Sequence, residues 1–248
     1  MQAIVLAGGK GERLWPLTTS TPKVMTLLCG KPLIRYHLEW LKKEGITDAV
    51  IACGYLAGVI KDYLENNPVD DLSIKFSCEG TLLGRGGASR KAAKYLPYQD
   101  RPCVLSQGDI ISDMPLAEAY RKHLESVSAL NIILTALLIP YRSRYGVIEL
   151  GSDGLIQRFR EKPRLPYWAN TGIFIASPEF FNFLPDQGDE DRTIEYLSSK
   201  ELVGSFCTHF YSRTVDTLKD VHEAEIDLSL PMLPHEEPFY SPTALLPT

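Results

Sequence analysis

The sequence predicts an α/β protein built on a mixed, mostly parallel sheet, with helices on its faces and a strand-rich second half. Two observations carry this prediction. Before about residue 110, short apolar runs alternate with longer amphipathic stretches, and beyond about residue 128 strand-like runs follow one another with few helices between them. The chain has 248 residues, of which 44% are hydrophobic, so it is long enough to bury a full core without disulfide support.

Residues 2–7 begin the parallel part of the predicted sheet. This apolar run ends abruptly at Gly8-Gly9-Lys10-Gly11, as expected for a buried strand that enters a loop. Further strands are expected at 48–53, 72–77 and 103–107, and helices at 32–44, 56–66 and 87–95. Strands that alternate with helices of this length are joined by right-handed crossovers, which predicts a Rossmann-like sheet flanked by helices.

The second half is expected to be richer in strands. These strands are predicted at 130–139, 145–150, 155–159, 171–176 and 205–211. Ser152-Asp153-Gly154 is a turn signal, which predicts a hairpin between the strands at 145–150 and 155–159. We expect residues 1–227 to form one unit, made of a first half at 1–128 and a second half at 129–227.

Residues 228–248 form a proline-rich C-terminal segment. Its five prolines are too many for a helix or a central strand, so we expect an extended tail. Two interpretations stay open: a loosely attached tail, or an arm that packs on another subunit of a homo-oligomer.

Composition disfavours several classes of protein. Asp and Glu outnumber Lys and Arg by 31 to 26, which gives a net charge of -5 and argues against a nucleic-acid partner. The five cysteines are never spaced as CxxC, so neither a zinc site nor a disulfide framework is predicted. No apolar stretch approaches the roughly 20 residues of a membrane span, and no signal peptide is recognisable, so we expect no membrane partner and a cytoplasmic location.

The segment 6–23 carries the strongest functional signal. Gly8, Gly9 and Gly11 follow a strand and would let backbone N–H groups approach a phosphate chain, while Arg13 and Lys23 add positive charge. The segment has neither the GxxxxGK[ST] pattern of a P-loop nor a GxGxxG that opens a helix, so a dinucleotide-dependent oxidoreductase is disfavoured.

LAGGKGERLWPLT at 6–18, followed by Pro22-Lys23, resembles the signature of the sugar-1-phosphate nucleotidyltransferases. Further matching segments follow in the same order and cover about residues 1–225: EGTLLGRGGA at 79–88, Gly108-Asp109, Tyr145-Gly146-Val147, Glu161-Lys162-Pro163 and Asn170-Thr171-Gly172. The resemblance implies an enzyme in which a sugar 1-phosphate attacks the α-phosphorus of a nucleoside triphosphate (NTP), giving a nucleotide sugar and pyrophosphate. It is nearest in character to the mannose-1-phosphate and manno-heptose-1-phosphate guanylyltransferases.

The resemblance also implies roles for individual residues. Those that would bind the nucleotide are Leu6, Ala7, Gly8, Gly9, Gly11, Arg13, Lys23, Glu79 and Gly84. Those that would bind the sugar phosphate are Gly146, Glu161, Lys162, Asn170, Thr171 and Gly172. Arg13, Lys23, Asp109 and Lys162 would be catalytic. Read without the resemblance, Asp109 could equally be a turn residue and Lys162 part of an exposed charged turn.

Two aspartates are the candidate ligands of Mg²⁺. Magnesium prefers carboxylates and phosphate oxygens, and Asp109 follows a predicted strand at its carboxyl end. By resemblance Asp216 is the second ligand. In the family this aspartate is usually followed by Gly-Thr-Pro, whereas here Thr217-Leu218-Lys219-Asp220 follows, as in glucose-1-phosphate cytidylyltransferases. That departure leaves the substrate open more than the reaction.

Glu79 bears on the choice of nucleotide. By resemblance it faces the Watson–Crick edge of the base, and a carboxylate offers only acceptors, which suit the N1–H and N2–H₂ donors of guanine better than uracil or thymine. Cytosine stays open, and so do two interpretations of Arg85, a solvent-facing cation or a phosphate contact. We expect GTP with mannose or manno-heptose 1-phosphate. The alternatives are cytidylyl or thymidylyl transfer to glucose 1-phosphate, or a regulatory homologue without turnover.

Overall fold

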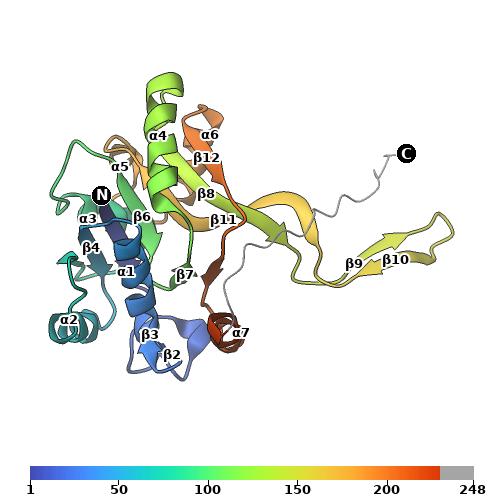
Figure 1. The fold of residues 1–248 in the computed structure, drawn as a ribbon, viewed down its shortest axis with the longest axis horizontal. Coiled ribbons are helices and arrows are strands. Elements are labelled where there is room, and N and C mark those ends of the chain that lie inside the picture. The colour runs from blue at the N-terminus through green and yellow to red at the C-terminus, as the bar shows by residue number, and fades with distance from the viewer. Residues whose placement is uncertain (230–248) are drawn as a thin grey trace.

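The computed structural model describes residues 1–229, and a seven-stranded sheet lies at their centre (Figure 1). Its strands are β1 (Gln2–Ala7), β4 (Asp48–Cys53), β5 (Ser73–Cys78), β6 (Cys103–Gln107), β8 (Leu134–Arg142), β11 (Arg164–Ala176) and β12 (Val203–Cys207), in the spatial order β12-β8-β11-β6-β1-β4-β5. β6, β1, β4 and β5 are mutually parallel, and β12 is parallel to β8. β11 runs antiparallel to both β6 and β8, so the predicted mixed, mostly parallel sheet is confirmed.

The parallel strands end together at one edge of the sheet. Gln2–Ala7 pairs residue by residue with Asp48–Cys53, which pairs in the same way with Ser73–Cys78. The residues that follow these strands, Gly8, Gly54 and Glu79, therefore emerge side by side, and Asp109 follows β6 at the same edge. The carboxyl edge of such a sheet is where α/β proteins bind their ligands.

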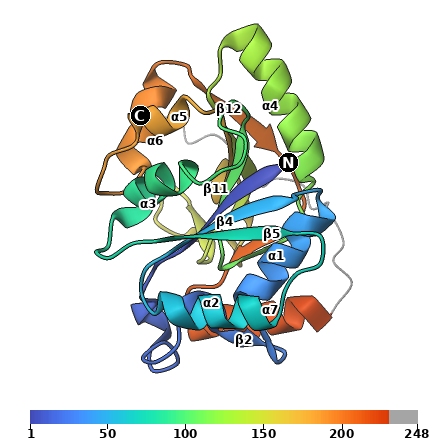
Figure 2. The same ribbon diagram turned by 90° about the vertical axis from the view of Figure 1, so that its left-hand side faces the viewer.

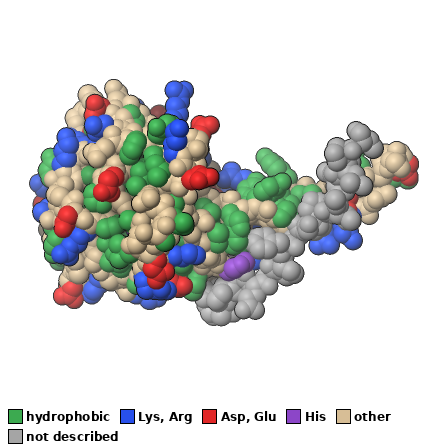
Figure 3. All heavy atoms as spheres, turned by 90° about the horizontal axis from the view of Figure 1, so that it is seen from above, with side chains coloured by type: hydrophobic (Ala, Val, Ile, Leu, Met, Phe, Trp, Pro, Cys, Tyr) green, Lys and Arg blue, Asp and Glu red, His purple; other side chains and the backbone are tan. Residues whose placement is uncertain are grey.

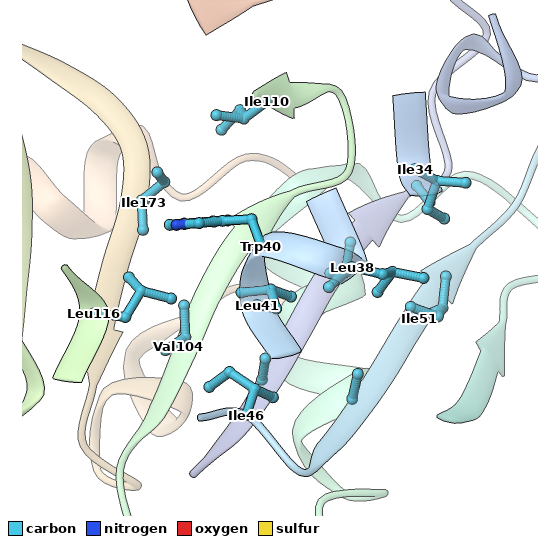
Figure 4. Packing of buried hydrophobic residues seen from close by; sticks show 14 of the residues in the cluster. Ile34, Leu38, Trp40, Leu41, Ile46, Ile51, Val104, Ile110, Leu116 and Ile173 are labelled. Atoms are coloured by element: carbon cyan, nitrogen blue, oxygen red, sulfur yellow. The ribbon is translucent and has the colours of Figure 1, made fainter. Parts of the chain in front are cut away.

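Helices cover both faces of the sheet (Figure 2). They are α1 (Leu33–Lys43), α2 (Ala57–Asn66), α3 (Gly84–Ala93), α4 (Leu116–Leu130), α5 (Phe180–Phe183), α6 (Asp191–Ser199) and α7 (Leu218–Ser229). One core packs α1, α2 and α4 on the face that carries Val5 and Ile51 (Figure 4). The other core packs α3, α5 and α6 on the face that carries Ile4 and Val50. Successive strand residues point to opposite faces, so each strand contributes to both cores.

One helix that the sequence did not predict, α4, spans the end of the first half and the start of the second. Leu116, Ala119 and His123 of α4 are buried at helical spacing, and Asn131, at a positive φ of 58°, ends this helix. The strand predicted from residue 130 consequently begins at Leu134. Of the run predicted at 205–211, only residues 205–207 form a strand, as the end of β12. The next strand, β13 (Ser212–Thr214), begins after the predicted run and leaves the central sheet to pair with β7 (Ile110–Ser112).

A two-stranded hairpin projects from the body of the molecule (Figure 1). Its strands are β9 (Val147–Leu150) and β10 (Ile156–Arg160), and they form a separate sheet. The predicted turn is present, with Gly154 at a φ of 81° and its N–H donating to the Gly151 carbonyl at 3.0 Å.

At the C-terminal end, α7 continues to Ser229, so residues 228 and 229 of the predicted tail are helical. The rest of that tail, 230–248, lies outside the described residues. Within residues 1–229 no helix combines the length and the apolar character that crossing a membrane requires.

Candidate active site

A cavity of about 540 Å³ opens at the carboxyl edge of the parallel strands. Its lining includes every residue that the sequence predicted for nucleotide and metal: Leu6, Ala7, Gly8, Gly9, Gly11, Arg13, Lys23, Glu79, Gly84, Asp109 and Asp216. These residues come from separate parts of the chain, and the parallel strands bring them together. The volume falls within the range of small-molecule sites in proteins.

A side chain at two glycines of the 8–11 loop would crowd neighbouring side chains. Gly11 has a φ of 67°, and a Cβ there would lie 2.8 Å from the Cβ of Lys23. A Cβ on Gly8 would lie 2.7 Å from Oε1 of Glu79. The Thr18 hydroxyl donates to the Gly11 carbonyl at 2.7 Å and stabilises this loop. The glycines therefore allow the backbone to run close to the side chains that line the cavity.

Four charged side chains form a connected chain on the cavity wall. The Lys23 ammonium contacts Oδ2 of Asp109 and lies 2.5 Å from Oδ1 of Asp216. Arg13 reaches the same Asp216 oxygen at 2.8 Å. Asp109 sits between β6 and β7, while Asp216 lies between β13 and α7. Two cations and two carboxylates thus meet from distant parts of the sequence.

Burial and pairing shift the pKa values of these groups in different directions. Burial raises the pKa of the Asp109 carboxyl, and the charge of Lys23 opposes that shift. Burial alone would also raise the pKa of the Asp216 carboxyl. The positive charges of Lys23 and Arg13 outweigh burial and hold this pKa below its usual range. For Lys23, burial favours the neutral amine, yet Asp109 and Asp216 together raise its pKa. The ammonium therefore stays charged between the carboxylates at neutral pH.

Asp109 has one oxygen without a partner. Its Oδ1 is buried and accepts no hydrogen bond from any group that the structure describes. A buried carboxylate oxygen without a donor is costly, so native proteins seldom leave one without a functional reason. This oxygen is a candidate ligand position for a cation.

His37 supports the turn that carries Asp109, a role that sequence reasoning missed. Its ring is fully buried, with Nδ1 at 2.8 Å from the Ile110 carbonyl and Nε2 at 2.8 Å from the Ser106 hydroxyl. A carbonyl can only accept, so Nδ1 donates and Nε2 accepts from Ser106. Burial lowers the pKa of His37 to about 4, which keeps the ring neutral. Nothing in the sequence marks this histidine, because its partners lie far along the chain.

The residues after Asp216, which depart from the family pattern, form the start of α7. The Thr217 hydroxyl accepts from the Asp220 N–H at 3.3 Å, and Asp220 Oδ2 accepts from the Thr217 N–H at 2.8 Å. This reciprocal arrangement is a capping box at the start of α7. Asp220 also accepts from the Asp216 N–H at 3.1 Å, so it holds the backbone of the residue whose side chain contacts Lys23 and Arg13.

Glu79 lies on the wall of the cavity with its carboxylate fixed. Its Oε2 accepts from the Leu83 N–H at 2.8 Å, just before α3 begins. Its Oε1 lies over Gly8 and Gly54, where an added Cβ would come within 2.7 Å and 2.5 Å of it. One oxygen is therefore used by the backbone, and the negative charge stays beside the glycine loop.

Arg85 pairs with an acidic loop. Its Nε lies 3.1 Å from Glu190 and one terminal nitrogen lies 2.7 Å from Asp191, while its backbone N–H donates to Asp189 at 3.0 Å. Sequence reasoning did not single out this loop, although Asp189 lines the cavity. The loops also touch through Gly84, where a Cβ would lie 2.6 Å from the Gly188 carbonyl.

Among residues 1–229, none of those predicted to bind the sugar phosphate lines this cavity. The nearest is Gly172, at a φ of 78°, where a Cβ would lie 2.9 Å from the amide of Gln107, a cavity residue. Thr171 is buried and donates to the Leu137 carbonyl at 2.7 Å. Asn170 accepts from the Gly172 N–H at 3.0 Å. These three residues shape the backbone beside Gln107.

Gly146, Glu161 and Lys162 form a second group at the base of the hairpin. A Cβ on Gly146 would lie 2.6 Å from the Phe159 ring and 3.3 Å from Glu161 Oε2. The Lys162 ammonium lies 4.0 Å from Glu161 Oε1, and Lys162 has an unusual positive φ of 43°. The structure thus places the predicted sugar-phosphate residues in two groups, one within β11 and the other at the hairpin base just before β11 begins.

The fold and this cavity match a known class. The profile of the nucleotidyl transferase family matches residues 2–211, and the chain belongs to this family. The chain is 34% identical over 189 residues to mannose-1-phosphate guanyltransferase 2 of Candida glabrata, which covers 74% of this chain and 52% of that protein. It is 31% identical over 204 residues to UTP–glucose-1-phosphate uridylyltransferase of a Synechocystis species, covering 77% and 53%. The chain therefore spans about half the length of these two relatives.

Solved structures confirm the fold class. HddC from Yersinia pseudotuberculosis superposes with a TM-score of 0.69 at 26% identity, covering 92% of this chain and 99% of that one. UDP-glucose pyrophosphorylase complexed with UDP-glucose gives the same TM-score at 19% identity, covering 92% and 98%, and this likeness supports the fold alone.

Proposed function

We propose that this chain transfers a guanylyl group from GTP to a sugar 1-phosphate, with mannose 1-phosphate or a manno-configured heptose 1-phosphate as the acceptor. The observation that carries the proposal is the Arg13–Asp216–Lys23–Asp109 cluster beside the glycine loop. Membership of the nucleotidyl transferase family supports the reaction type. The similarity to mannose-1-phosphate guanyltransferases supports the choice of substrates.

The reaction needs charge neutralisation and alignment more than a protein nucleophile. An oxygen of the sugar phosphate attacks the α-phosphorus of the NTP, the bond to the β-phosphate oxygen breaks, and pyrophosphate leaves. Arg13 and Lys23 neutralise charge on the triphosphate, and N–H groups of the 8–11 loop contact its oxygens. Holding both anions in line accounts for much of the expected acceleration.

Mg²⁺ fits the residues of the cluster. Asp109 and Asp216 supply carboxylate oxygens, the donors that this ion prefers, and the unpartnered Oδ1 of Asp109 is a vacant acceptor. Among residues 1–229 no group of three or more His, Cys, Asp or Glu side chains is arranged to hold a metal by itself. Substrate phosphates and water would complete the coordination, as is usual for this ion. When bound, Mg²⁺ would stabilise negative charge on the phosphates.

Glu79 supports guanine as the base. Its carboxylate has only acceptors and stands on the cavity wall with Gly8 and Gly54 beneath it. Guanine presents two adjacent donors, whereas uracil and thymine present one donor between two acceptors. The fixed carboxylate therefore favours GTP over UTP and dTTP.

For the sugar 1-phosphate we propose the residues at the hairpin base and those in the middle of β11. Lys162 would neutralise the phosphate and Glu161 would accept hydrogen bonds from sugar hydroxyls. Gly146, Asn170, Thr171 and Gly172 would shape the backbone around the sugar. The contact of Gly172 with Gln107 supports this assignment, because Gln107 lines the nucleotide cavity.

We place the protein in the reducing environment of the cytoplasm. The five cysteines are odd in number and never spaced as CxxC, so the sequence gives no sign of the disulfide framework typical of oxidising compartments.

Pyrophosphate release tests the function. The purified chain is incubated with Mg²⁺, each of ATP, CTP, GTP, UTP and dTTP, and mannose, manno-heptose or glucose 1-phosphate. Release with GTP and a manno-configured sugar is the expected result. Release only with CTP or dTTP and glucose 1-phosphate would favour the alternative substrates. No release from any pair, with GTP binding retained in calorimetry, would favour a regulatory homologue.

A further inference from the structure

Two cysteines meet on neighbouring strands of the central sheet. Cys53 is the last residue of β4 and Cys78 is the last residue of β5, and the two are partners in the register of these strands. Their sulfur atoms lie 3.2 Å apart. Neighbouring strands lie about 4.8 Å apart, and a disulfide bond can join Cα atoms at that separation. The backbone therefore already holds the two thiols where a disulfide bond can form.

The two thiols differ in their access to solvent. Cys53 is fully buried in the core that α1 and α2 cover, whereas Cys78 is exposed. Burial raises the pKa of the Cys53 thiol to about 12, so this thiol is protonated at neutral pH. A reagent that arrives from solution therefore meets the sulfur of Cys78 first, with the sulfur of Cys53 behind it.

The strand that carries Cys78 lies at the edge of the sheet. Among residues 1–229, β5 pairs with β4 alone, and Cys78 is the residue at which this pairing ends. The end of an edge strand can shift at a lower cost in free energy than a strand in the centre of a sheet, because fewer contacts hold it. Cys78 can therefore approach Cys53 without disturbing the rest of the parallel sheet.

The residues that follow the two cysteines belong to the nucleotide side of the molecule. Glu79, which lines the cavity, comes directly after Cys78, and its N–H donates to the Cys53 carbonyl at 2.9 Å. Oε1 of Glu79 lies so close to Gly54, the residue after Cys53, that an added Cβ there would come within 2.5 Å of it. Because space is this tight, a shift of Cys78 toward Cys53 moves the carboxylate of Glu79 within the cavity.

We propose that Cys53 and Cys78 form a redox modification site, at which a reversible disulfide bond weakens nucleotide binding in the adjoining cavity. The effect on the nucleotide rests on the proposed function, whereas the bond itself does not. In a reducing cytoplasm such a bond is transient, as expected of a regulatory disulfide.

The oxidant is a low-molecular-weight disulfide such as oxidised glutathione. The sulfur of Cys78 attacks one sulfur of the reagent, which forms a mixed disulfide and releases one thiol. The sulfur of Cys53 then attacks the sulfur of Cys78, and the bond to the reagent breaks to release the second thiol. Two protein thiols are oxidised and the reagent gains two electrons, while the two thiol protons end on the released thiols. Reduced glutathione reverses both steps.

The site lies on the opposite side of the molecule from the proposed sugar-phosphate residues of the hairpin base. β4 and β5 end the central sheet on the side away from the β9–β10 hairpin (Figure 1). The projecting segment leaves the other side of the body, as the view from above shows (Figure 3). Oxidation should therefore weaken nucleotide binding and leave KM for the sugar 1-phosphate unchanged.

Thiol mapping of the full chain tests the bond. Cys29→Ser with Cys207→Ser removes the other exposed thiols and leaves Cys53, Cys78 and the buried Cys103. This variant is equilibrated at rising ratios of oxidised to reduced glutathione, the remaining thiols are alkylated, and the peptides are identified by mass spectrometry. A peptide pair joined through Cys53 and Cys78 is the expected product. A glutathione adduct that stays on Cys78, or no reaction there, would overturn the proposal.

Isothermal titration with GTP measures the effect of the bond. The oxidised variant should bind GTP about tenfold more weakly than the reduced one, and dithiothreitol should restore the affinity. By reciprocity, saturating GTP should lower the equilibrium constant for forming the bond by the same factor. Adding Cys78→Ser as the matched control should give the affinity of the reduced chain under both conditions. Equal affinities of the oxidised and reduced chains would overturn the proposal.

The outcome for the proposed function can be read separately. The reduced chain reports the substrates through pyrophosphate release, and the mapped bond does not depend on that result. If the reduced chain uses another nucleotide, the titration is repeated with that nucleotide, and only the choice of GTP fails. A chain that carries the bond and still reacts at the reduced rate at limiting nucleotide would overturn the redox site and leave the proposed function standing.

Discussion

The two halves of the molecule hold their candidate residues in different ways. On the nucleotide side, Lys23, Asp109 and Asp216 are drawn from distant parts of the chain into direct contact beneath a glycine loop. On the sugar side, Glu161 and Lys162 sit at the base of a projecting hairpin, outside that cavity. The difference suggests that a rigid parallel sheet builds the nucleotide site, whereas the sugar site depends on how the hairpin is held.

Among the variants proposed here, Asp109→Asn should reduce activity most. It changes a side chain that the parallel sheet holds in the nucleotide cavity. It removes one of the two carboxylates available to Mg²⁺, so we expect kcat/KM to fall about a thousandfold. Its melting temperature should not fall, because burial raises the pKa of Asp109 and the ionised carboxyl is costly there.

Initial rates in Mg²⁺, with Asp70→Asn as the exposed control, provide the measurement for Asp109. A variant with near-normal kcat would show that Asp109 is not the ligand. That result would leave the comparison between the nucleotide side and the sugar side standing. It would show that Mg²⁺ binding by Asp109 does not account for catalysis.

Two lysine variants distinguish the nucleotide site from the proposed sugar-phosphate site. Lys23→Ala should weaken GTP binding about a hundredfold, and it should lower the melting temperature because it leaves the buried Asp109 without its cation and Asp216 with Arg13 alone. Lys162→Ala should raise KM for the sugar 1-phosphate about tenfold and leave GTP binding unchanged. Isothermal titration with GTP and initial rates against the sugar 1-phosphate measure the two effects. Equal losses of GTP binding in both variants would contradict the division.

The stability of the nucleotide half should depend on pH through His37. Burial lowers its pKa from 6.5 to about 4 in the folded chain. Between these values the unfolded chain binds a proton that the folded chain does not, so the free energy of unfolding falls as the pH drops. The loss at pH 4 should be about 3 kcal/mol for this residue.

Urea unfolding between pH 7 and pH 4 measures the effect of His37. His37→Gln should flatten part of the pH dependence, whereas His222→Gln, an exposed histidine of α7, should leave it unchanged. His123, whose pKa burial also lowers to about 4, accounts for a further part of the slope. Identical slopes in the wild type and His37→Gln would exclude this role.

Glu79→Gln sharpens the account of the base. The amide replaces one acceptor with a donor, so we expect the preference for GTP over UTP to fall about tenfold. Competition between the two nucleotides in one reaction measures this ratio. An unchanged preference for GTP over UTP would show that Glu79 does not select the base.

Arg85→Ala should have the smallest effect. It frees the acidic loop from α3, so KM for GTP should rise about threefold with little change in kcat, because the salt bridges are partly exposed. Arg85→Lys should recover part of the loss. A large fall in kcat would place Arg85 among the groups that contact the phosphates.

The sequence predicted most of the parallel part of the fold. In the first half, the alternation of apolar runs with amphipathic stretches located β1, β4, β6 and α1 within a residue of their bounds. The second half was harder, because tertiary contacts decide its elements. The helices α5 and α6 were missed there, as was α4 at the end of the first half, and β13 pairs with β7 across a long stretch of sequence, which no local pattern reveals.

The candidate site could be predicted only where its residues form sequence motifs. The glycine segment, Asp109 and Asp216 were all expected, and the structure brings them to one cavity. His37 and the 188–191 loop were not, because their contacts with Ser106 and with Arg85 depend on the folded chain. The distance between the hairpin base and the cavity also depends on the folded chain. The sequence motifs at the hairpin base could not predict this distance.

A competition experiment tests the proposed function most directly. All five nucleoside triphosphates are mixed at equal concentration with mannose 1-phosphate, Mg²⁺ and the wild-type chain, and the products are identified by mass spectrometry. The account predicts that the GDP-linked sugar dominates from the earliest time point and forms about a thousandfold more slowly with Asp109→Asn. A CDP-, UDP- or dTDP-linked sugar as the main product, or no nucleotide sugar at all, would contradict it.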